Sequence, residues 1–328
     1  MTNTMESFFG VLDESAQLIS TALDLSYLEA LSETADNVFH GAVLQEEINE
    51  TDKKRLEKQY ETIRIDQFTK ETIRKAYQLA ILKGMKQHIQ PNHQMTPDSI
   101  GLFIAYLMRK SLNPSAPFTV LDPAAGSGNL LFTVLNEFDG LAEAHGVEID
   151  EVLVKLAYAG ANLLKQPVSL HTQDALEPLL IDPVDAVVCD LPVGYYPNDA
   201  RAAKYTLQAD QGHSYAHHLF IEQSLTHTKP GGWLFFLIPN GLFESPEAKK
   251  LQAFLTDQAV IEGMIQLPES LFKSKAAAKS IMMIRKKAPG VQKPKEVLLA
   301  ALPSLTNKQA TAAMIAKMDA WFANRQKG

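Results

Sequence analysis

The 328-residue sequence is poor in cysteine, and this excludes several kinds of site. Cys189 is the only one, so neither an intramolecular disulfide nor a cysteine-based zinc site can form. Its neighbours are apolar residues of a predicted strand, and nothing nearby indicates the lowered pKa of a reactive nucleophile. We therefore interpret Cys189 as a buried structural thiol. The nine histidines show no metal-ligand spacing with carboxylates, and we assign no metal.

The sequence also lacks an uninterrupted apolar run of the roughly 18 residues that a membrane-spanning helix needs. Its first residues, MTNTMESFFG, lack the basic start of a secretory signal. Hydrophobic residues make up 46% of the chain and charged residues 21%, which is typical of globular proteins and too apolar for general disorder. We therefore expect a cytoplasmic protein, long enough for two domains at about 150 residues each.

Basic residues are missing from the start of the chain, and the charge is unevenly distributed. Residues 1–51 contain ten Asp and Glu and no Lys or Arg. Residues 249–295 contain ten Lys and Arg against three Asp and Glu, a net charge of +7, although the whole chain carries −7. The basic segment either contacts phosphates or is a solvated face or a partner surface for the acidic N-terminus.

Apolar residues at helical spacing run through the first 90 residues, for example in FFGVLDESAQLISTAL and IRKAYQLAILKGM, with no convincing strand between them. We predict an all-helical N-terminal domain over residues 1–90 and a second domain over residues 91–328. Thr96 before Pro97 predicts a helix N-cap followed by proline at the first helical position.

Beyond residue 117, short apolar runs alternate with helical patterns. Seven strands are predicted, namely FTVLD, AHGVEI, VSLHTQD, VDAVVCD, WLFFLIP, VIEGMIQLP and SIMMIRKK, and the tail NKQATAAMIAKMDAWFANRQ predicts a closing helix. Strands that alternate with helices favour an α/β fold with a mostly parallel sheet and helices on both faces. In such sheets, ligands bind beyond the carboxyl ends of the strands.

Three successive strand ends carry groups suited to a nucleoside. The first strand ends in LDPAAGSGNLL, where Gly126 and Gly128 permit a tight turn and the helix from Asn129 offers unpaired N–H groups. A plain strand-to-helix turn would explain these glycines too. Glu148 follows about 22 residues beyond Gly126, where an acidic side chain accepts from ribose hydroxyls, unless it is a solvent-exposed strand-end carboxylate. Asp174 ends the third strand and can accept from an adenine amine.

Five segments in this order carry a family resemblance: DPAAGSGNLL, GVEID, QDAL, DLPVGYY and KPGGWLFFLIPNGLF. They resemble class I S-adenosylmethionine-dependent methyltransferases, specifically the branch that modifies adenine in DNA. The resemblance covers roughly residues 90–287. NHQMTPDSIGLFIAYLM looks like the segment before the cofactor loop in that branch, including the catalytic subunits of Type I restriction-modification systems. The sequence is most similar to small stand-alone bacterial members with a helical N-terminal extension.

The resemblance implies S-adenosylmethionine as the cofactor, bound at a Rossmann-like, seven-stranded methyltransferase sheet. Thr96 and Pro97 would lie against the methionine moiety, Glu148 would take the ribose hydroxyls and Ile149 would flank the adenine. The implied cofactor-binding residues are Thr96, Pro97, Asp122, Pro123, Ala124, Gly126, Gly128, Asn129, Glu148, Ile149, Asp174, Ala175 and Asp190.

The loop after the fourth strand, VVCDLPVGYYP, carries the predicted chemistry. In the adenine branch this loop reads Asn or Asp, Pro, Pro, then Tyr or Phe. The resemblance makes Asp190 the side-chain acceptor for the amino hydrogens and the main-chain carbonyl of Leu191 the second acceptor, while Pro192 retains backbone rigidity. Catalysis would rest on positioning and electrostatics, with no covalent enzyme intermediate.

Val193 is a departure from this pattern, because it stands where the family has an aromatic ring that stacks on the flipped base. Such stacking is worth about 1–3 kcal/mol per base. Tyr195 or Tyr196 either replaces the missing ring or packs the loop onto the sheet. Gly194 gives the loop the freedom to bring one of them round.

We therefore predict a methyltransferase acting on an exocyclic amino group, with adenine in DNA as the favoured substrate. The alternatives are methylation of RNA or of a protein amide, or a cofactor-binding regulatory protein without transferase activity, which Val193 and Leu191 favour and Asp190 disfavours. About 40 residues follow the last predicted strand, too few for a target-recognition domain. Sequence specificity would then come from a partner subunit or the helical domain, or be absent. The sequence leaves the oligomeric state open.

Overall fold

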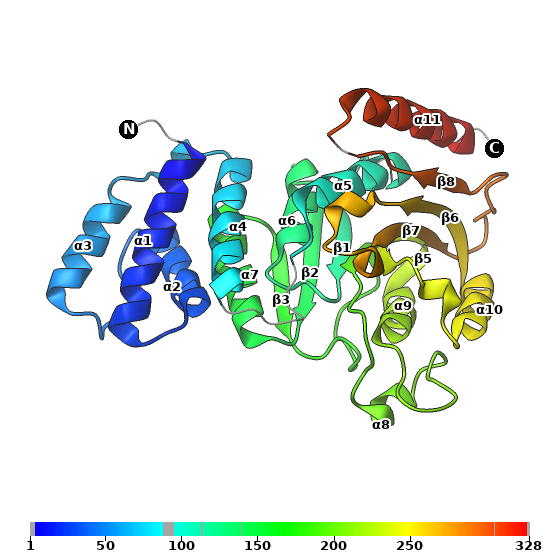
Figure 1. The fold of residues 1–328 in the computed structure, drawn as a ribbon, viewed down its shortest axis with the longest axis horizontal. Helices are drawn as coiled ribbons and strands as arrows, with labels where there is room; N and C mark the ends of the chain where they lie inside the picture. Colours follow the sequence, from blue (N-terminus) through cyan, green and yellow to red (C-terminus); the bar gives the residue numbers. More distant parts are fainter. Residues whose placement is uncertain (1–3, 88–94, 113, 139, 305, 327–328) are drawn as a thin grey trace. The chain divides into compact units, whose positions relative to one another are not determined.

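The computed structural model describes residues 4–87, 95–112, 114–138, 140–304 and 306–326. Figure 1 labels the elements. The α-helices are α1 Met5–Leu23, α2 Tyr27–His40, α3 Glu50–Tyr60, α4 Lys70–Gln87, α5 Asp98–Leu112, α6 Asn129–Glu137, α7 Glu151–Leu164, α8 Asp199–Ala202, α9 Ala216–Thr226, α10 Ala248–Gln258 and α11 Lys308–Gln326. The strands are β1 Phe118–Asp122, β2 Ala142–Glu148, β3 Val168–Thr172, β4 Val184–Asp190, β5 Thr228–Pro239, β6 Ala259–Gln266, β7 Lys279–Lys286 and β8 Leu298–Ala301.

The chain divides into two compact units, each built from two stretches of sequence. The first unit comprises Met1–Leu102 and Ala125–Gln173, and the second comprises Phe103–Ala124 and Asp174–Gly328. The predicted division at residue 90 is a single cut along the sequence and stays a prediction. Among the described residues, no helix combines the length and the apolar character needed to cross a membrane.

The first unit begins with helices whose ends are set by local sequence. Thr4 and Ser7 form a capping box at the start of α1, and Ser26 and Glu29 form another at the start of α2. Each box satisfies two backbone N–H groups that a helix start otherwise leaves unpaired. The described part of residues 1–90 is helical, as the sequence predicts.

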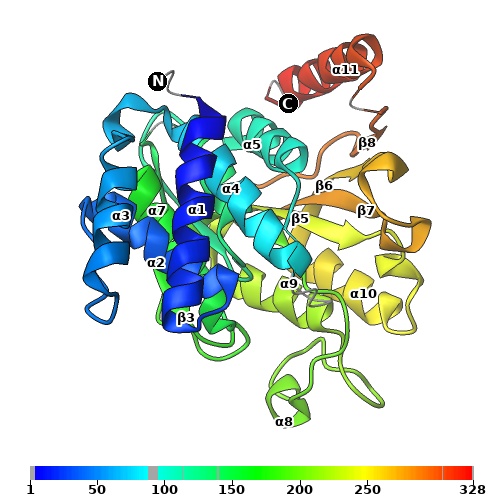
Figure 2. The ribbon, with the colours of Figure 1, turned by 60° about the vertical axis from the view of Figure 1, so that its left-hand side comes forward.

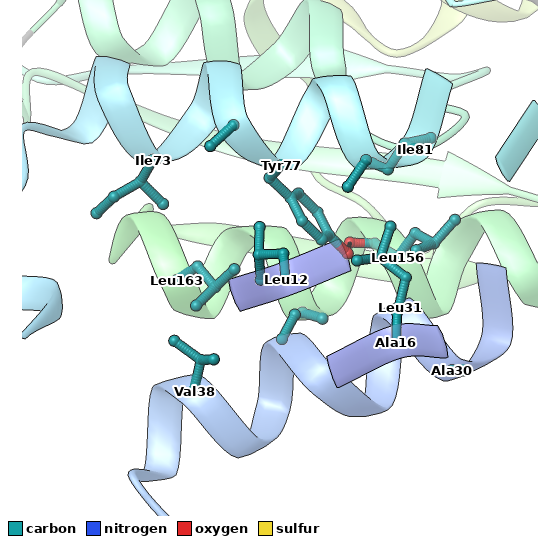
Figure 3. Close-up of a cluster of buried hydrophobic side chains, with 14 of the residues drawn as sticks. Leu12, Ala16, Ala30, Leu31, Val38, Ile73, Tyr77, Ile81, Leu156 and Leu163 are labelled. Atoms are coloured by element: carbon teal, nitrogen blue, oxygen red, sulfur yellow. Dashed lines mark hydrogen bonds between the residues drawn. The ribbon is translucent and has the colours of Figure 1, made fainter. Parts of the chain in front are cut away.

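The core of the first unit joins these N-terminal helices to α7. Figure 3 shows apolar side chains of α1, α2, α4 and α7 meeting in one cluster, including Leu12, Leu31 and Ile81. Tyr77 of α4 lies within it and donates a 2.9 Å hydrogen bond from its hydroxyl to the carbonyl of Leu156 in α7. The N-terminal helices therefore share their core with α7, a helix that follows the glycine-containing turn at residues 126–128 in the sequence.

The described residues form eight strands, which pair mostly in parallel. In the first unit β2 pairs with β3 in parallel. In the second unit the order is β1-β4-β5-β7-β6-β8, with β7 antiparallel to both β5 and β6. The seven predicted strands are present, but the count was one too low. Strand β8 was missed because its four residues, LLAA, are too few to show a strand pattern and Leu299 is exposed.

The closing helix that the sequence predicts is present as α11. The long connection between β4 and α9 projects from the sheet and carries the short helix α8 near its tip (Figure 2). Helix α5 starts at Asp98, because the amide of Gly101 donates to the carbonyl of Pro97 at 3.2 Å. Thr96 is therefore not the N-cap, and the predicted helix start was one residue early.

Two buried histidines in α9 predict a pH-dependent stability. Burial lowers the pKa of His217 and of His218 from 6.5 to about 4, and the charge of His217 adds to the shift at His218. The unfolded chain takes up these protons below pH 6.5 and the folded chain does not. The stabilisation is therefore complete above pH 6.5 and is lost as the pH falls toward 4.

We expect unfolding in urea to show a loss of roughly 2 kcal/mol per histidine between pH 7.5 and 5. Replacing both residues, His217→Leu with His218→Leu, should flatten this dependence. The exposed His213 supplies the control, and His213→Gln should leave the slope unchanged. If the free energy of unfolding depended on pH equally in the double variant and the unaltered protein, His217 and His218 would not be the source of this dependence.

Candidate functional site

The turn after β1 has a backbone that requires glycine. Gly126 has a φ of +54° and Gly128 a φ of +82°, and Gly128 is the residue directly before α6. A Cβ atom on Gly128 would lie 2.5 Å from the ring of Phe132. Left-handed φ angles disfavour other residues, and here the close ring adds a steric reason. The turn leads directly into α6, and anion binding by the first N–H groups of this helix stays a prediction.

Glu148, at the end of β2, fixes this turn. Its Oε2 atom accepts a 2.8 Å hydrogen bond from the amide of Gly126. Its Oε1 atom accepts from the amides of Ile149 and Asp150, each at 2.9 Å. A carboxylate has about four acceptor sites, so Glu148 retains capacity for a further donor such as a ribose hydroxyl. The side chain of Ile149 is 66% exposed, as a residue flanking a ligand face would be.

The segment before α5 is held at the first residue of α6. The carbonyl of Thr96 accepts a 2.9 Å hydrogen bond from the side-chain Nδ2 of Asn129. Both residues are buried. Thr96 and Pro97 are thus tied to the start of α6, and these are two stretches that the resemblance assigns to one cofactor.

Within the second unit, Asp122 ends β1 as a buried carboxylate. Its Oδ1 atom accepts from the amide of Ala124 at 3.1 Å. Cys189 is fully buried, and burial, together with the charges of Asp122 and Asp190, raises the pKa of its thiol well above the usual value. The thiol is therefore protonated at neutral pH, which agrees with a structural role.

Asp174, which follows β3, holds the loop after β4. Its Oδ1 atom accepts from the amide of Leu176 at 2.9 Å, and its Oδ2 atom accepts from the hydroxyl of Tyr196. Burial, then this hydrogen bond, raises the pKa of Tyr196 above the usual value. The carbonyl of Ala175 accepts from the side chain of Gln223 at 2.7 Å. Tyr196 is thus a packing residue, with its ring buried and its hydroxyl engaged.

Tyr195, by contrast, is 64% exposed. Its ring stacks on that of Tyr215, with centroids 5.1 Å apart and planes at 19°. The loop is fastened to the start of α9 by the amide of Ala216, which donates to the carbonyl of Gly194 at 2.9 Å. One face of Tyr195 is therefore braced by a second ring. Val193 is also exposed in this loop.

Asp190, at the end of β4, forms an ion pair with Lys279, at the start of β7. The pairing follows from the sheet, because β5 lies between β4 and β7 and aligns Pro239 with Lys279. The next residue, Leu191, is buried, and its amide donates to the carbonyl of Leu237 at 3.2 Å. In the sequence, Lys279 is only one of the basic residues of segment 249–295. Its position beside Asp190 depends on the antiparallel pairing of β5 with β7, which the sequence patterns did not predict.

Comparison with known proteins now places the chain in a family. The model of the N-6 DNA Methylase family matches residues 70–327, and that of the YtxK N-terminal helical domain matches residues 6–85. The chain belongs to the N-6 DNA methylase family. It is 51% identical over 316 residues to the uncharacterised protein YtxK of Bacillus subtilis (strain 168), covering 96% of both chains.

Two solved structures are similar. A Listeria monocytogenes protein assigned to the class I S-adenosylmethionine-dependent methyltransferases is 48% identical, with a TM-score of 0.90 over 97% of this chain and 98% of that one. A type I restriction-modification methyltransferase subunit from Streptococcus thermophilus is 16% identical, with a TM-score of 0.62 over 97% of this chain and 74% of that one, and shows the fold alone. The predicted family and fold are confirmed, and S-adenosylmethionine is the cofactor that N-6 DNA methylases use.

The glycine turn yields a prediction for cofactor binding. Gly128→Ala should weaken S-adenosylmethionine binding by about tenfold or more, since strain and the collision with Phe132 cost at least about 1.4 kcal/mol. Isothermal titration calorimetry measures the affinity. Gly290→Ala is the matched control, because Gly290 has a φ of +86° but no atom within 4 Å of the added Cβ, and it lies between β7 and β8. Equal cofactor affinity in the two variants would contradict this role of Gly128.

Proposed function

We propose that this protein transfers the methyl group of S-adenosylmethionine to the exocyclic amino group of adenine in DNA. The observation that carries the proposal is a carboxylate at the end of β4, Asp190, followed by the buried Leu191 and the exposed ring of Tyr195. Membership of the N-6 DNA methylase family supports the substrate class. A DNA substrate agrees with the predicted cytoplasmic location, and a partner subunit would supply sequence specificity.

The cofactor-binding groups fit the proposal in each unit taken by itself. In the first unit these are Thr96, Pro97, Gly126, Gly128, Asn129, Glu148 and Ile149, and in the second they are Asp122, Pro123, Ala124, Asp174, Ala175 and Asp190. The N–H groups at the start of α6 suit the methionine carboxylate. The carboxylates suit ribose hydroxyls and a cationic sulfonium. When bound, S-adenosylmethionine supplies an electrophilic methyl group.

The acceptor chemistry rests on Asp190 and the main chain of Leu191. The nitrogen of an aromatic amine is a poor nucleophile, because its lone pair is delocalised into the ring. Two oxygens that accept its hydrogens favour the tetrahedral nitrogen that forms as the new bond is made. Lys279 pairs with Oδ1 of Asp190, and the proposal gives the carboxylate of Asp190 the role of accepting a hydrogen from the amine.

The stacking role falls to Tyr195 rather than Tyr196 in this proposal. Tyr196 is buried and donates to Asp174, so it has no free ring face to offer. Tyr195 is exposed and braced from behind by Tyr215, which is the arrangement that a base-stacking platform needs. In this proposal, Tyr195 replaces the stacking ring that the family has at the position of Val193.

The second candidate function is a cofactor-binding protein without transferase activity. Val193 is the observation that favours it, because the family's stacking ring is missing at that position. The ion pair between Asp190 and Lys279 also engages the proposed acceptor. The two candidate functions differ in one measurable outcome, which is whether the methyl group is transferred from S-adenosylmethionine to another molecule.

A transfer assay separates these functions. The protein is incubated with S-adenosylmethionine labelled in the methyl group and with separate pools of DNA, RNA and protein, and label should appear on N6 of adenine in DNA. Asp190→Ala should abolish this transfer, because it removes the side-chain acceptor for the amine. It should change cofactor affinity by less than about threefold, because Asp190 is one of thirteen proposed cofactor-binding residues and the other twelve remain. Label confined to RNA or protein would overturn the proposed substrate.

The control for this experiment addresses the lysine that Asp190→Ala would leave unpaired. Lys279→Met alone removes the ion pair and keeps the acceptor, so it should retain transfer. Asp190→Ala combined with Lys279→Met removes both charges and should remain inactive. Restored transfer in the double variant would show that the unpaired lysine, rather than the lost acceptor, caused the defect.

Tyr195 gives a separate prediction for substrate binding. Tyr195→Ala should raise the KM for DNA by about 5- to 150-fold, the equivalent of losing about 1–3 kcal/mol of stacking, without changing cofactor affinity. Tyr195→Phe should keep the ring and the activity. Val193→Ala is the control, since Val193 is exposed in the same loop. If Val193→Ala raised the KM for DNA and Tyr195→Ala did not, the stacking role proposed for Tyr195 would be wrong.

A further inference from the structure

Arg74, in the second turn of α4, has a buried guanidinium whose five N–H groups all donate hydrogen bonds. It is 2% exposed. Its Nε and Nη2 atoms donate to the two carboxylate oxygens of Glu71, each at 2.8 Å. Its Nη1 and Nη2 atoms donate to the two oxygens of Asp98 at 2.9 and 2.8 Å. The fifth hydrogen goes from Nη1 to Oδ1 of Asn129 at 3.0 Å. Five N–H donors are all that an arginine has, and no other side chain matches this set.

Asn129 connects Arg74 to the glycine turn at residues 126–128, because it accepts from Arg74 and directly follows this turn. It is the first residue of α6 and directly follows Gly128. Its Oδ1 atom accepts from Arg74, while its Nδ2 atom donates to the carbonyl of Thr96 at 2.9 Å. Asp98 follows Thr96 by two residues and accepts from both Arg74 and Asn129. Arg74 therefore fixes two segments at once, the start of α6 and the segment before α5.

The charges of this network are kept at neutral pH. Burial alone would raise the pKa of Asp98 and of Glu71, but the hydrogen bonds and charge of Arg74 outweigh it and hold both values below the usual range. The same partners raise the pKa of Arg74. A buried ion pair adds little net stability, because desolvation offsets the attraction. Fixed geometry is what such a network contributes beyond an apolar contact of similar volume.

We propose that Arg74 is a positioning residue for S-adenosylmethionine, holding Asn129 and Thr96 in the arrangement in which the loop at Gly126 and Gly128 binds the cofactor. The proposal rests on the cofactor-binding residues proposed above. Arg74 does not itself touch the cofactor in this account. It acts by fixing the groups that do, so that their ordering is complete before the ligand arrives.

The location of Arg74 gives the helical segment a part in cofactor binding. Helix α4 lies in the overlap of the two family matches, residues 70–85. Ile73 and Tyr77, on either side of Arg74 in the sequence, belong to the core that α4 shares with α1, α2 and α7. The packing of the N-terminal helices therefore sets the position from which Arg74 reaches α6. On this proposal the helical layer is part of the cofactor-binding apparatus.

The test is a titration of the full-length protein with S-adenosylmethionine, followed by calorimetry, for three variants at the α4 network. Arg74→Met should raise the Kd about tenfold or more, the expected effect of losing a buried charged hydrogen-bond set. Arg74→Lys should not restore affinity, because an ammonium cannot reproduce the planar fork. Lys75→Met is the matched control on the next residue, whose exposed ammonium pairs with Glu71 at 3.3 Å, and its Kd should stay within about twofold.

A second readout separates positioning from plain stabilisation. In the absence of cofactor, the backbone amides of residues 126–129 should exchange hydrogen faster in Arg74→Met, while those of α1 and α2 stay as protected as in the unaltered protein. Should Arg74→Met fail to fold, Asp98→Asn keeps the volume and weakens the same network, and its Kd should rise in the same direction. A lowered melting temperature with unchanged Kd and unchanged exchange at 126–129 would overturn the proposal.

A double-mutant cycle tests the route through Asn129. If Arg74 acts through this side chain, Arg74→Met should change the Kd by less than about twofold in an Asn129→Ala background. If Arg74→Met still raised the Kd tenfold in the Asn129→Ala background, Arg74 would not act through Asn129. The outcomes also separate this inference from the proposed function. Absence of binding by the unaltered protein would remove both, whereas normal binding by Arg74→Met would remove this inference alone.

Discussion

The left-handed turn between β1 and α6 is the constraint on which the account of this protein depends. Gly126 and Gly128 both have positive φ angles, and Phe132 leaves no room for a side chain at Gly128. Glu148 holds the amide of Gly126 in place. Because Gly126 is held from the end of β2, the backbone of the turn does not have to be ordered when a ligand binds. A nucleoside-bearing cofactor with a carboxylate at its far end suits the acceptors and donors gathered there.

In the proposed function, Asp190 of the second unit is the group that distinguishes an amino-methyltransferase from a protein that only binds the cofactor. β7 runs antiparallel beside β5, and this brings Lys279 to Asp190 at the end of β4. Asp174 takes the hydroxyl of Tyr196, and Tyr195 is left exposed with Tyr215 behind it. A loop that departs from the family pattern at Val193 thus still offers a carboxylate and a ring.

Sequence patterns predicted what depends on local spacing and failed where distant residues meet. The glycine turn, the strand-end carboxylates and seven of the eight strands follow from short motifs, and the structure contains them. Two of the partners of Arg74, Asp98 and Asn129, lie 24 and 55 residues away, and Lys279 lies 89 residues from Asp190. No periodicity records such pairings, because they depend on helix packing and strand order. The sequence also left open which of Tyr195 and Tyr196 has an exposed ring. The structure shows that Tyr196 is buried and donates to Asp174, whereas Tyr195 is exposed.

The most direct test of the account is a crystal structure of the protein with S-adenosylhomocysteine, the product that remains after methyl transfer. The account predicts that the ribose hydroxyls lie within hydrogen-bond distance of Glu148. It also predicts that the amino-acid carboxylate faces the N–H groups between Gly126 and Asn129. A ligand bound away from this turn, or a Glu148 carboxylate that makes no contact with the ribose, would contradict it.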